Sequence, residues 1–335
     1  HPDRGPLRAW SLAILGALEP TLSAQQQAAG NTAVTEMTDY LRTLVAARRR
    51  QPGDPERDVL TRLIQGEAGG EQLSEVELLQ NCIFLLNAGH ETTTNLIGNG
   101  LILLQEFPAA RAGLLHALQQ TTGDADAEEA VLDRAVDEFL RFEPSNQLGN
   151  RRVLKDTRVG GVDLPAGTLV TLCIAAANRD PAQFSEPETL KLAREGNKHL
   201  AFGFGIHQCA GLSLARLEGR IAIGQFLRRF PDYRLSEAPT RGGRARFRGF
   251  LSAPGGRRHL GPAKPEPRCL WWALLLWWRV ALRRVRGAPL CSARRDRWAG
   301  LRVLRRLNLF GRAHDGLRHR HVHPAALGPE AGGVR

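Results

Sequence analysis

The sequence predicts a mainly α-helical protein with a small β portion, and three observations support that fold class. Apolar residues recur at helical spacing over long stretches, a capping pattern opens the longest of them, and the extended segments are short and bounded by glycine or proline turns. The length of 335 residues would allow about two domains, although single enzymes of this size are common.

The N-terminal helices are predicted from apolar spacing and from their end signals. The first is an amphipathic helix that ends in three arginines before Pro52, and its apolar stripe consists of Val34, Met37, Leu41 and Leu44. A shorter helix over 59–64 closes at Gly66. Ser74 and Glu77 form a capping box for a helix from Glu75 to about Glu106, which would be roughly 48 Å long and is stopped by Pro108.

This long helix is apolar enough to be mistaken for a membrane span. Asn87, His90 and Glu91 lie at its centre, and charged or amide side chains facing lipid would be costly. We therefore expect a helix that crosses the protein interior, and no membrane span.

The second half of the chain predicts two more helices and the β portion. The helices run over about 128–142, ending before Pro144, and over 212–229. Short β-like pieces lie around Val159, over 169–175 and over 247–251, separated by the glycines at 160 and 161 and by a Pro-Ala-Gly turn at 165–167.

The net charge of +12 would suggest a nucleic-acid binder, but its distribution excludes that for most of the chain. Residues 261–335 hold 16 of the 46 basic and four of the 34 acidic residues, so residues 1–260 hold 30 of each sign. We predict a domain over 1–260 and a tail over 261–335 that is rich in Arg, Trp, Gly and Pro. The tail is either a non-native translation, a disordered segment or a membrane or nucleic-acid contact, and we assign it no function.

The cysteines and the first residues indicate the compartment. Five cysteines, an odd number in a long chain, favour a reduced cytoplasmic setting over a disulfide framework. The first ten residues lack the charged and then apolar layout of a secretory signal.

The strongest chemical signal is the segment over 202–211, FGFGIHQCAG. Cys82 and Cys173 lie in apolar runs and are interpreted as buried small hydrophobes. Cys209 is different because glycines precede it and a predicted helix follows it directly. The unpaired N–H groups and the dipole of a helix N-terminus favour a thiolate that can ligate a metal, and Gly211 leaves room for a flat ligand.

The segment resembles the haem-binding loop of the cytochromes P450, with the Phe-x-x-Gly-x-x-x-Cys-x-Gly spacing intact at Phe202, Gly205, Cys209 and Gly211. The resemblance covers about residues 3–254 and implies a partial P450 fold, with the helices from about F/G to L and the C-terminal β pieces. It implies that Cys209 is the axial ligand of the iron of haem b and that His207 contacts a haem propionate.

Three further motifs match the family. Glu138 and Arg141 resemble the Glu-x-x-Arg of helix K, a buried structural ion pair, although Thr189 stands where the family usually supplies a third partner, an arginine. Arg151 matches an arginine that pairs with a propionate, and the adjacent Arg152 is an alternative.

The third of these motifs lies at the centre of the long helix. Ala88 and Gly89 would let this helix pass close over a haem face, whereas larger side chains would fill the oxygen pocket. By resemblance, Glu91 and Thr92 form the acid and alcohol pair that delivers protons. A mid-helix threonine can also turn its hydroxyl to the carbonyl one turn back.

The resemblance implies a haem-thiolate monooxygenase that inserts one oxygen atom of O2 into a small organic substrate. Electrons would come from a ferredoxin-like donor with its reductase, since the sequence contains no Gly-x-Gly-x-x-Gly fingerprint. Two alternatives stay open. One is a relative that uses peroxide or dehydrates its substrate, and the other is a non-catalytic remnant that binds haem weakly or not at all, because about 150 residues of the family's N-terminal part have no counterpart by the resemblance.

Overall fold

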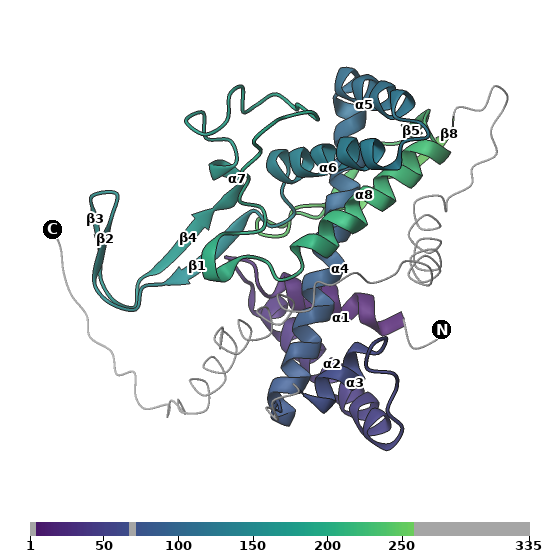
Figure 1. Cartoon of the computed structure of the whole chain (residues 1–335). Helices are drawn as coiled ribbons and strands as arrows, with labels where there is room; N and C mark the ends of the chain where they lie inside the picture. Colours follow the sequence, from purple (N-terminus) through teal and green to yellow (C-terminus); the bar gives the residue numbers. More distant parts are fainter. Residues whose placement is uncertain (1–4, 67–71, 258–335) are drawn as a thin grey trace. The chain divides into compact units, whose positions relative to one another are not determined.

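The computed structural model describes residues 5–66 and 72–257. The expectations for the tail over 261–335 lie outside the described residues. The helices are α1 (Gly5–Gly16), α2 (Ala24–Arg50), α3 (Val59–Gln65), α4 (Glu75–Glu106), α5 (Pro108–Gln120), α6 (Ala125–Phe142), α7 (Ile174–Ala177) and α8 (Leu212–Arg229). The predicted class, mainly α with a small β portion, is confirmed (Figure 1).

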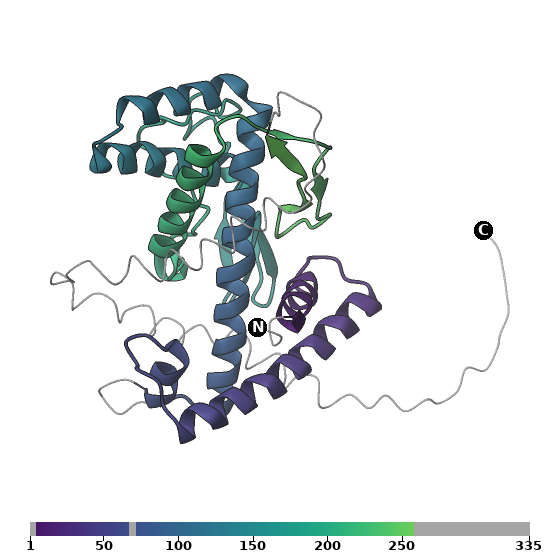
Figure 2. The same cartoon turned by 90° about the vertical axis from the view of Figure 1, so that its right-hand side faces the viewer.

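The long helix α4 has the bounds that the sequence predicts. The Ser74 hydroxyl accepts the N–H of Glu77 at 3.3 Å, and the Glu77 carboxylate accepts the Ser74 N–H at 2.9 Å. This capping box satisfies two backbone donors that the first turn leaves free. Figure 2 shows α4 running lengthwise, with other helices packed along it. No helix in the described ranges is long and apolar enough to cross a bilayer.

The first half of α4 packs against α1, α2 and α3. Their shared core consists of Ile14, Ala33, Met37, Leu41, Val45, Leu78, Leu79 and Cys82. The predicted stripe on α2 is mostly right, but Val34 is 37% exposed because the buried face runs through Ala33 instead. Ser23 and Gln26 form a second capping box, at the start of α2.

The second half of α4 packs against α5, α6 and α8, and two glycines allow the close approach. A Cβ on Gly100 would lie 3.0 Å from the Phe139 ring, and one on Gly219 would lie 3.1 Å from Leu96. The core here includes Leu104, Ala135, Val136, Phe139, Ile223 and Leu227, all at most 1% exposed. Each fully buried large side chain of this kind contributes about 1.5–3 kcal/mol.

Helices α5 and α6 differ from the sequence-based expectation. α5 begins at Pro108, which the sequence analysis uses only as the stop of α4; proline also fits the first helical position, where its missing N–H costs nothing. α6 begins at Ala125, earlier than predicted, because the Asp124 carboxylate caps it by accepting the Ala127 N–H at 3.0 Å.

The β portion consists of short antiparallel pairs: β1 (Leu148–Arg152) with β4 (Leu169–Cys173), β2 (Thr157–Val159) with β3 (Val162–Leu164), β5 (Tyr233–Leu235) with β8 (Gly255–Arg257), and β6 (Thr240–Arg241) with β7 (Phe250–Ser252). Leu148 is opposite Cys173 in the first pair. The prediction that Cys173 is buried is wrong, since β4 pairs only with β1 among the described strands and Cys173 is exposed. Cys82 is buried, as predicted.

Candidate functional site

The segment that holds Cys209 is a folded loop closed by its own backbone. The Cys209 N–H donates to the Phe202 carbonyl at 2.8 Å, and the Gln208 N–H donates to Gly205 at 3.0 Å. Gly203 has φ +67°, and a Cβ there would lie 3.2 Å from the His207 carbonyl oxygen. This backbone conformation favours glycine, so the loop geometry depends on Gly203.

The Cys209 thiol lies just before α8, is exposed, and forms no disulfide. Gly211 is the N-cap residue, and no side chain caps the first N–H groups of α8. A Cβ on Gly211 would come within 4 Å of one atom, the Cys209 sulfur at 3.9 Å. The sulfur therefore lies beside uncapped donors that stabilise negative charge, with open space over Gly211.

His207 and Arg151 place an imidazole and a guanidinium near this loop. Burial, and then the positive charge of Arg151, lower the pKa of His207 below its ordinary value of 6.5. Arg151 lies on β1 and donates to the Asn150 carbonyl at 2.8 Å. In the part of the chain that the structure describes, neither side chain has a carboxylate partner. Arg152 instead donates to the Gly167 carbonyl at 3.3 Å.

The centre of α4 combines small residues with polar groups. Ala88 and Gly89 are exposed, and a Cβ on Gly89 would meet nothing within 4 Å. The Thr92 hydroxyl donates to the Ala88 carbonyl at 2.6 Å, as the sequence predicts. The Thr92 carbonyl accepts the Ser145 hydroxyl at 2.7 Å. The surface beside these residues is thus open, while the helix itself is held in place.

Glu91, the acidic residue of this motif, forms an ion pair that the sequence does not predict. Arg244 donates to Glu91 Oε1 at 2.5 Å, and the two side chains are 16% and 13% exposed. The other oxygen, Oε2, is buried and has no hydrogen-bond partner among the described residues.

The element that follows Cys209 is fixed to α4. Gly219 of α8 packs against Leu96, and Glu218 interacts with Thr93, which is buried and adjacent to Thr92. Burial raises the pKa of Glu218, although its hydrogen bond with Thr93 acts in the opposite direction. Because α8 starts directly after the cysteine loop, this packing anchors one end of that loop.

Glu138 and Arg141 form a buried pair with both side chains 0% exposed. Arg141 donates from Nε and Nη2 to the two carboxylate oxygens of Glu138 at 2.8 and 2.9 Å. Its remaining donors reach the carbonyls of Asn178, Pro187 and Thr189. The guanidinium therefore joins α6 to the segment that leads to the cysteine loop.

A second arginine completes this network although Thr189 departs from the family pattern. Arg194 donates from Nε to Glu138 Oε2 at 3.0 Å, and Asn197 donates to the same oxygen at 3.1 Å. Thr189 contributes only its carbonyl, which accepts from Arg141 and Arg194. Arg194 follows in the same loop, so the sequence contained a signal that could have identified it. No comparable signal pointed to Arg244.

Comparisons with known proteins decide the family. The family model described as Cytochrome P450 matches residues 13–241. The chain belongs to the cytochrome P450 family. Cytochrome P450 107B1 of Saccharopolyspora erythraea is 38% identical over 237 residues, which are 70% of this chain and 53% of that relative. The polyketide biosynthesis cytochrome P450 PksS of Bacillus subtilis is 36% identical over 238 residues, 71% of this chain and 54% of the relative.

Solved P450 structures share the fold. P450BioI, in complex with an acyl carrier protein ligated to hexadec-9Z-enoic acid, superposes with a TM-score of 0.68 at 32% identity and covers 77% of this chain and 63% of that one. The chain spans about half the length of the curated relatives it matches. P450 membership implies a haem iron as the cofactor.

Proposed function

We propose that this chain forms the haem-thiolate site of a monooxygenase that inserts one oxygen atom of O2 into a small organic substrate. The observation that carries the proposal is the Cys209 loop: a free, exposed thiol beside the uncapped N-terminus of α8, bordered by Gly211, which leaves open space next to the sulfur. A haem-thiolate ligand needs these features, since the sulfur must be ionised and a flat ligand must reach it.

The residues present fit a haem. Cys209 would provide the iron ligand, while Arg151 and His207 would hold the haem carboxylates. The Arg151 guanidinium lies close enough to lower the pKa of His207, and neither side chain has a carboxylate partner among the described residues, so an anionic group would accept hydrogen bonds from both. The sequence contains no Cys-x-x-Cys-His segment for covalent attachment, which supports haem b. Phe202 and Gly205 maintain the loop that positions the cysteine.

When bound, the haem supplies the activation of O2. The residues of this chain would keep space open beside α4 for the substrate and would transfer protons. Ala88 and Gly89 leave room beside α4, and the Thr92 hydroxyl lies one residue from the Glu91 carboxyl group. We assign Glu91 as the residue that exchanges protons with solvent and Thr92 as the hydroxyl that passes them on. Replacing Thr92 by alanine should therefore release peroxide in place of product.

The substrate and the electron donor are part of the same proposal. A ferredoxin-like protein with its reductase would supply electrons, since this sequence contains no dinucleotide-binding fingerprint. The odd number of cysteines supports a reduced, cytoplasmic location. The name of PksS and the acyl ligand in the P450BioI complex favour an aliphatic substrate, free or carried by a protein. We do not adopt the remnant alternative, because the cysteine loop, the Arg151 and His207 side chains and the polar centre of α4 are all in place.

The spectrum of the reduced CO complex tests the proposal, because it reports whether a thiolate binds the haem iron. The full chain is reconstituted with haem, reduced and exposed to CO. We expect the thiolate-type spectrum. A spectrum of the imidazole type, or no haem uptake, would contradict the proposed function.

A further inference from the structure

The ion pair between Arg244 and Glu91 leads to an inference that rests on the proposed role of Glu91. We propose that Arg244 is a positioning residue: it holds one oxygen of the Glu91 carboxyl group and connects this acid to helix α1. Arg244 lies in the segment 242–249 between β6 and β7, far from Glu91 in the sequence.

The two oxygens of the Glu91 carboxylate have different surroundings. Oε1 is held by Arg244 at 2.5 Å, whereas Oε2 is buried without a partner among the described residues. A buried carboxylate retains its charge only where a cation compensates for the lost hydration. Arg244 therefore provides the compensation on one side, and the other oxygen is free to accept a hydrogen bond from water or from a group in the site.

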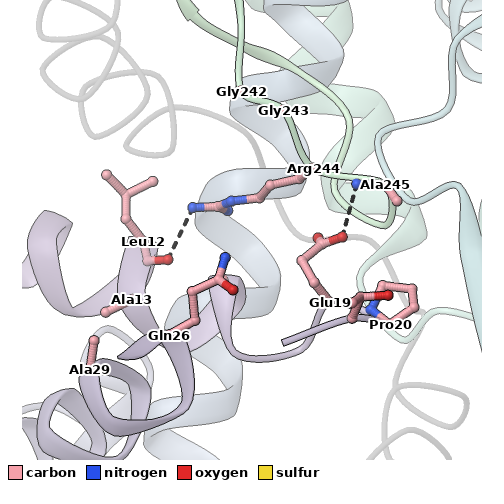
Figure 3. A pocket seen from close by; sticks show the side chains of 12 residues that line it. Leu12, Ala13, Glu19, Pro20, Gln26, Ala29, Gly242, Gly243, Arg244 and Ala245 are labelled. Carbon is pink, nitrogen blue, oxygen red and sulfur yellow. Dashed lines mark hydrogen bonds between the residues drawn. The ribbon is translucent and has the colours of Figure 1, made fainter. Parts of the chain in front are cut away.

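Arg244 is itself held by α1 and by the segment between α1 and α2. Its Nη2 donates to the Leu12 carbonyl on α1 at 3.0 Å. The Glu19 carboxylate accepts three consecutive backbone N–H groups, from Ala245 and Arg246 at 2.8 and 2.9 Å and from Phe247 at 3.4 Å. Figure 3 shows Arg244 pointing toward Leu12, and Glu19 reaching the backbone at Ala245.

These contacts border a cavity of about 460 Å³. Its lining includes Leu12, Glu19, Gly242 and Arg244, so it lies where α1 meets the segment that holds Arg244 (Figure 3). A displacement of α1 or of Glu19 would move the guanidinium that holds Glu91. The position of the acid on α4 is thereby coupled to the contact between α1 and segment 242–249.

Carbodiimide labelling of carboxyl groups, read by peptide mass spectrometry, tests the ion pair without haem. The full chain is compared with Arg244→Gln, with Arg244→Lys, and with Arg241→Gln as the matched control. Arg241 lies in the same hairpin but pairs at 3.0 Å with a different carboxylate, Glu143. We expect Arg244→Gln to increase Glu91 labelling several-fold, Arg244→Lys to restore most of the protection, and Arg241→Gln to leave Glu91 unchanged.

A double-mutant cycle distinguishes the loss of this ion pair from general unfolding of a variant. Thermal midpoints are measured for Glu91→Gln, Arg244→Gln and the double variant, with circular dichroism as a check on folding. If the pair exists, the double variant loses less than the two single variants together. Additive losses, or equal Glu91 labelling in the wild type and in Arg244→Gln, would overturn the inference.

The haem-loaded chain separates this inference from the proposed function. Arg244→Gln should keep the thiolate-type CO spectrum, because Cys209 is untouched, while releasing more peroxide per electron, and Arg244→Lys should reverse the peroxide release. Unchanged peroxide release with an intact thiolate spectrum would refute the positioning role alone. Absence of the thiolate-type spectrum in the wild type would refute the proposed function. The labelling result would then still show whether the ion pair between Arg244 and Glu91 exists.

Discussion

Replacing Arg194 by methionine should lower the free energy of unfolding by about 3–5 kcal/mol, because it removes a charged hydrogen bond to a buried carboxylate and three hydrogen bonds to backbone carbonyls. Glu138 is 0% exposed, and the Arg194 side chain is only 7% exposed. Methionine keeps most of the apolar stem but supplies no donor. Glu138 would keep Arg141, Asn197 and the backbone N–H of Lys191 as partners.

The magnitude follows from the contacts that are lost. The charged bond from Arg194 Nε to Glu138 is worth about 1.5–3 kcal/mol. Arg194 also donates to the carbonyls of Ser185, Glu186 and Thr189 at 2.8, 3.2 and 3.2 Å, and each of these neutral acceptors adds about 0.5–1 kcal/mol, less where water replaces the donor. The loss is large against a total stability of about 5–15 kcal/mol.

Urea unfolding provides the assay, and Lys191→Met is the matched control. Lys191 lies in the same loop, but its ammonium pairs with Glu186 at the surface, with the two side chains 36% and 63% exposed, so its loss should cost far less. With a slope of about 3 kcal/mol per molar urea, Arg194→Met should lower the midpoint by about 1 M or more. Equal midpoints for the two variants would show that Arg194 does not complete the network.

Three further substitutions test packing and pH dependence. Gly219→Ala places a Cβ 3.1 Å from Leu96 and should destabilise the protein by about 1–3 kcal/mol. Gly98→Ala places a Cβ that meets nothing within 4 Å and should stabilise α4 by about 0.5–1 kcal/mol. Thermal unfolding of both variants should give stability changes of opposite sign, and changes of the same sign would contradict the packing described. Burial raises the pKa of Asp137, but hydrogen bonds from His199 and Arg216 outweigh it and hold the pKa below 3.8. The stabilisation that Asp137 provides is thus present above pH 3.8 and is lost as pH falls toward the lower folded-state pKa. Asp137→Asn should therefore weaken the dependence of the unfolding free energy on pH in this acid range. An unchanged pH dependence would refute this.

The sequence predicted the parts of the fold whose causes are local. The bounds of α4 follow from Ser74 and Glu77 at one end and from Pro108 at the other, all within a few residues of the helix ends. Helix α1 was not predicted, because glycine and proline lie at its start and the apolar residues that follow are nearly continuous. Cys173 was misassigned because an apolar run does not reveal whether a second layer covers the strand.

The residues of the candidate site likewise include some whose role follows from neighbouring sequence and some whose role does not. The Cys209 loop was identified because its glycines, its cysteine and the helix that follows are contiguous. Arg194, the second arginine on Glu138, and Arg244, the partner of Glu91, were not, since they are separated from those acids by 56 and 153 residues. Only the packing of α4 and α6 against later segments brings these charges together. The pairing of Arg244 with Glu91 depends on tertiary structure, which spacing within the sequence does not encode, whereas Arg194 follows in the same loop as Thr189.

X-ray absorption at the iron edge of the haem-reconstituted chain tests the central claim most directly, because it detects a sulfur atom bound to iron. Cys173→Ser is the matched control, since Cys173 is the other exposed cysteine among the described residues. We predict an iron–sulfur shell in the wild type and in Cys173→Ser, and its loss in Cys209→Ser. A sulfur shell that persists in Cys209→Ser, or none in the wild type, would contradict the assignment of Cys209 as the haem ligand.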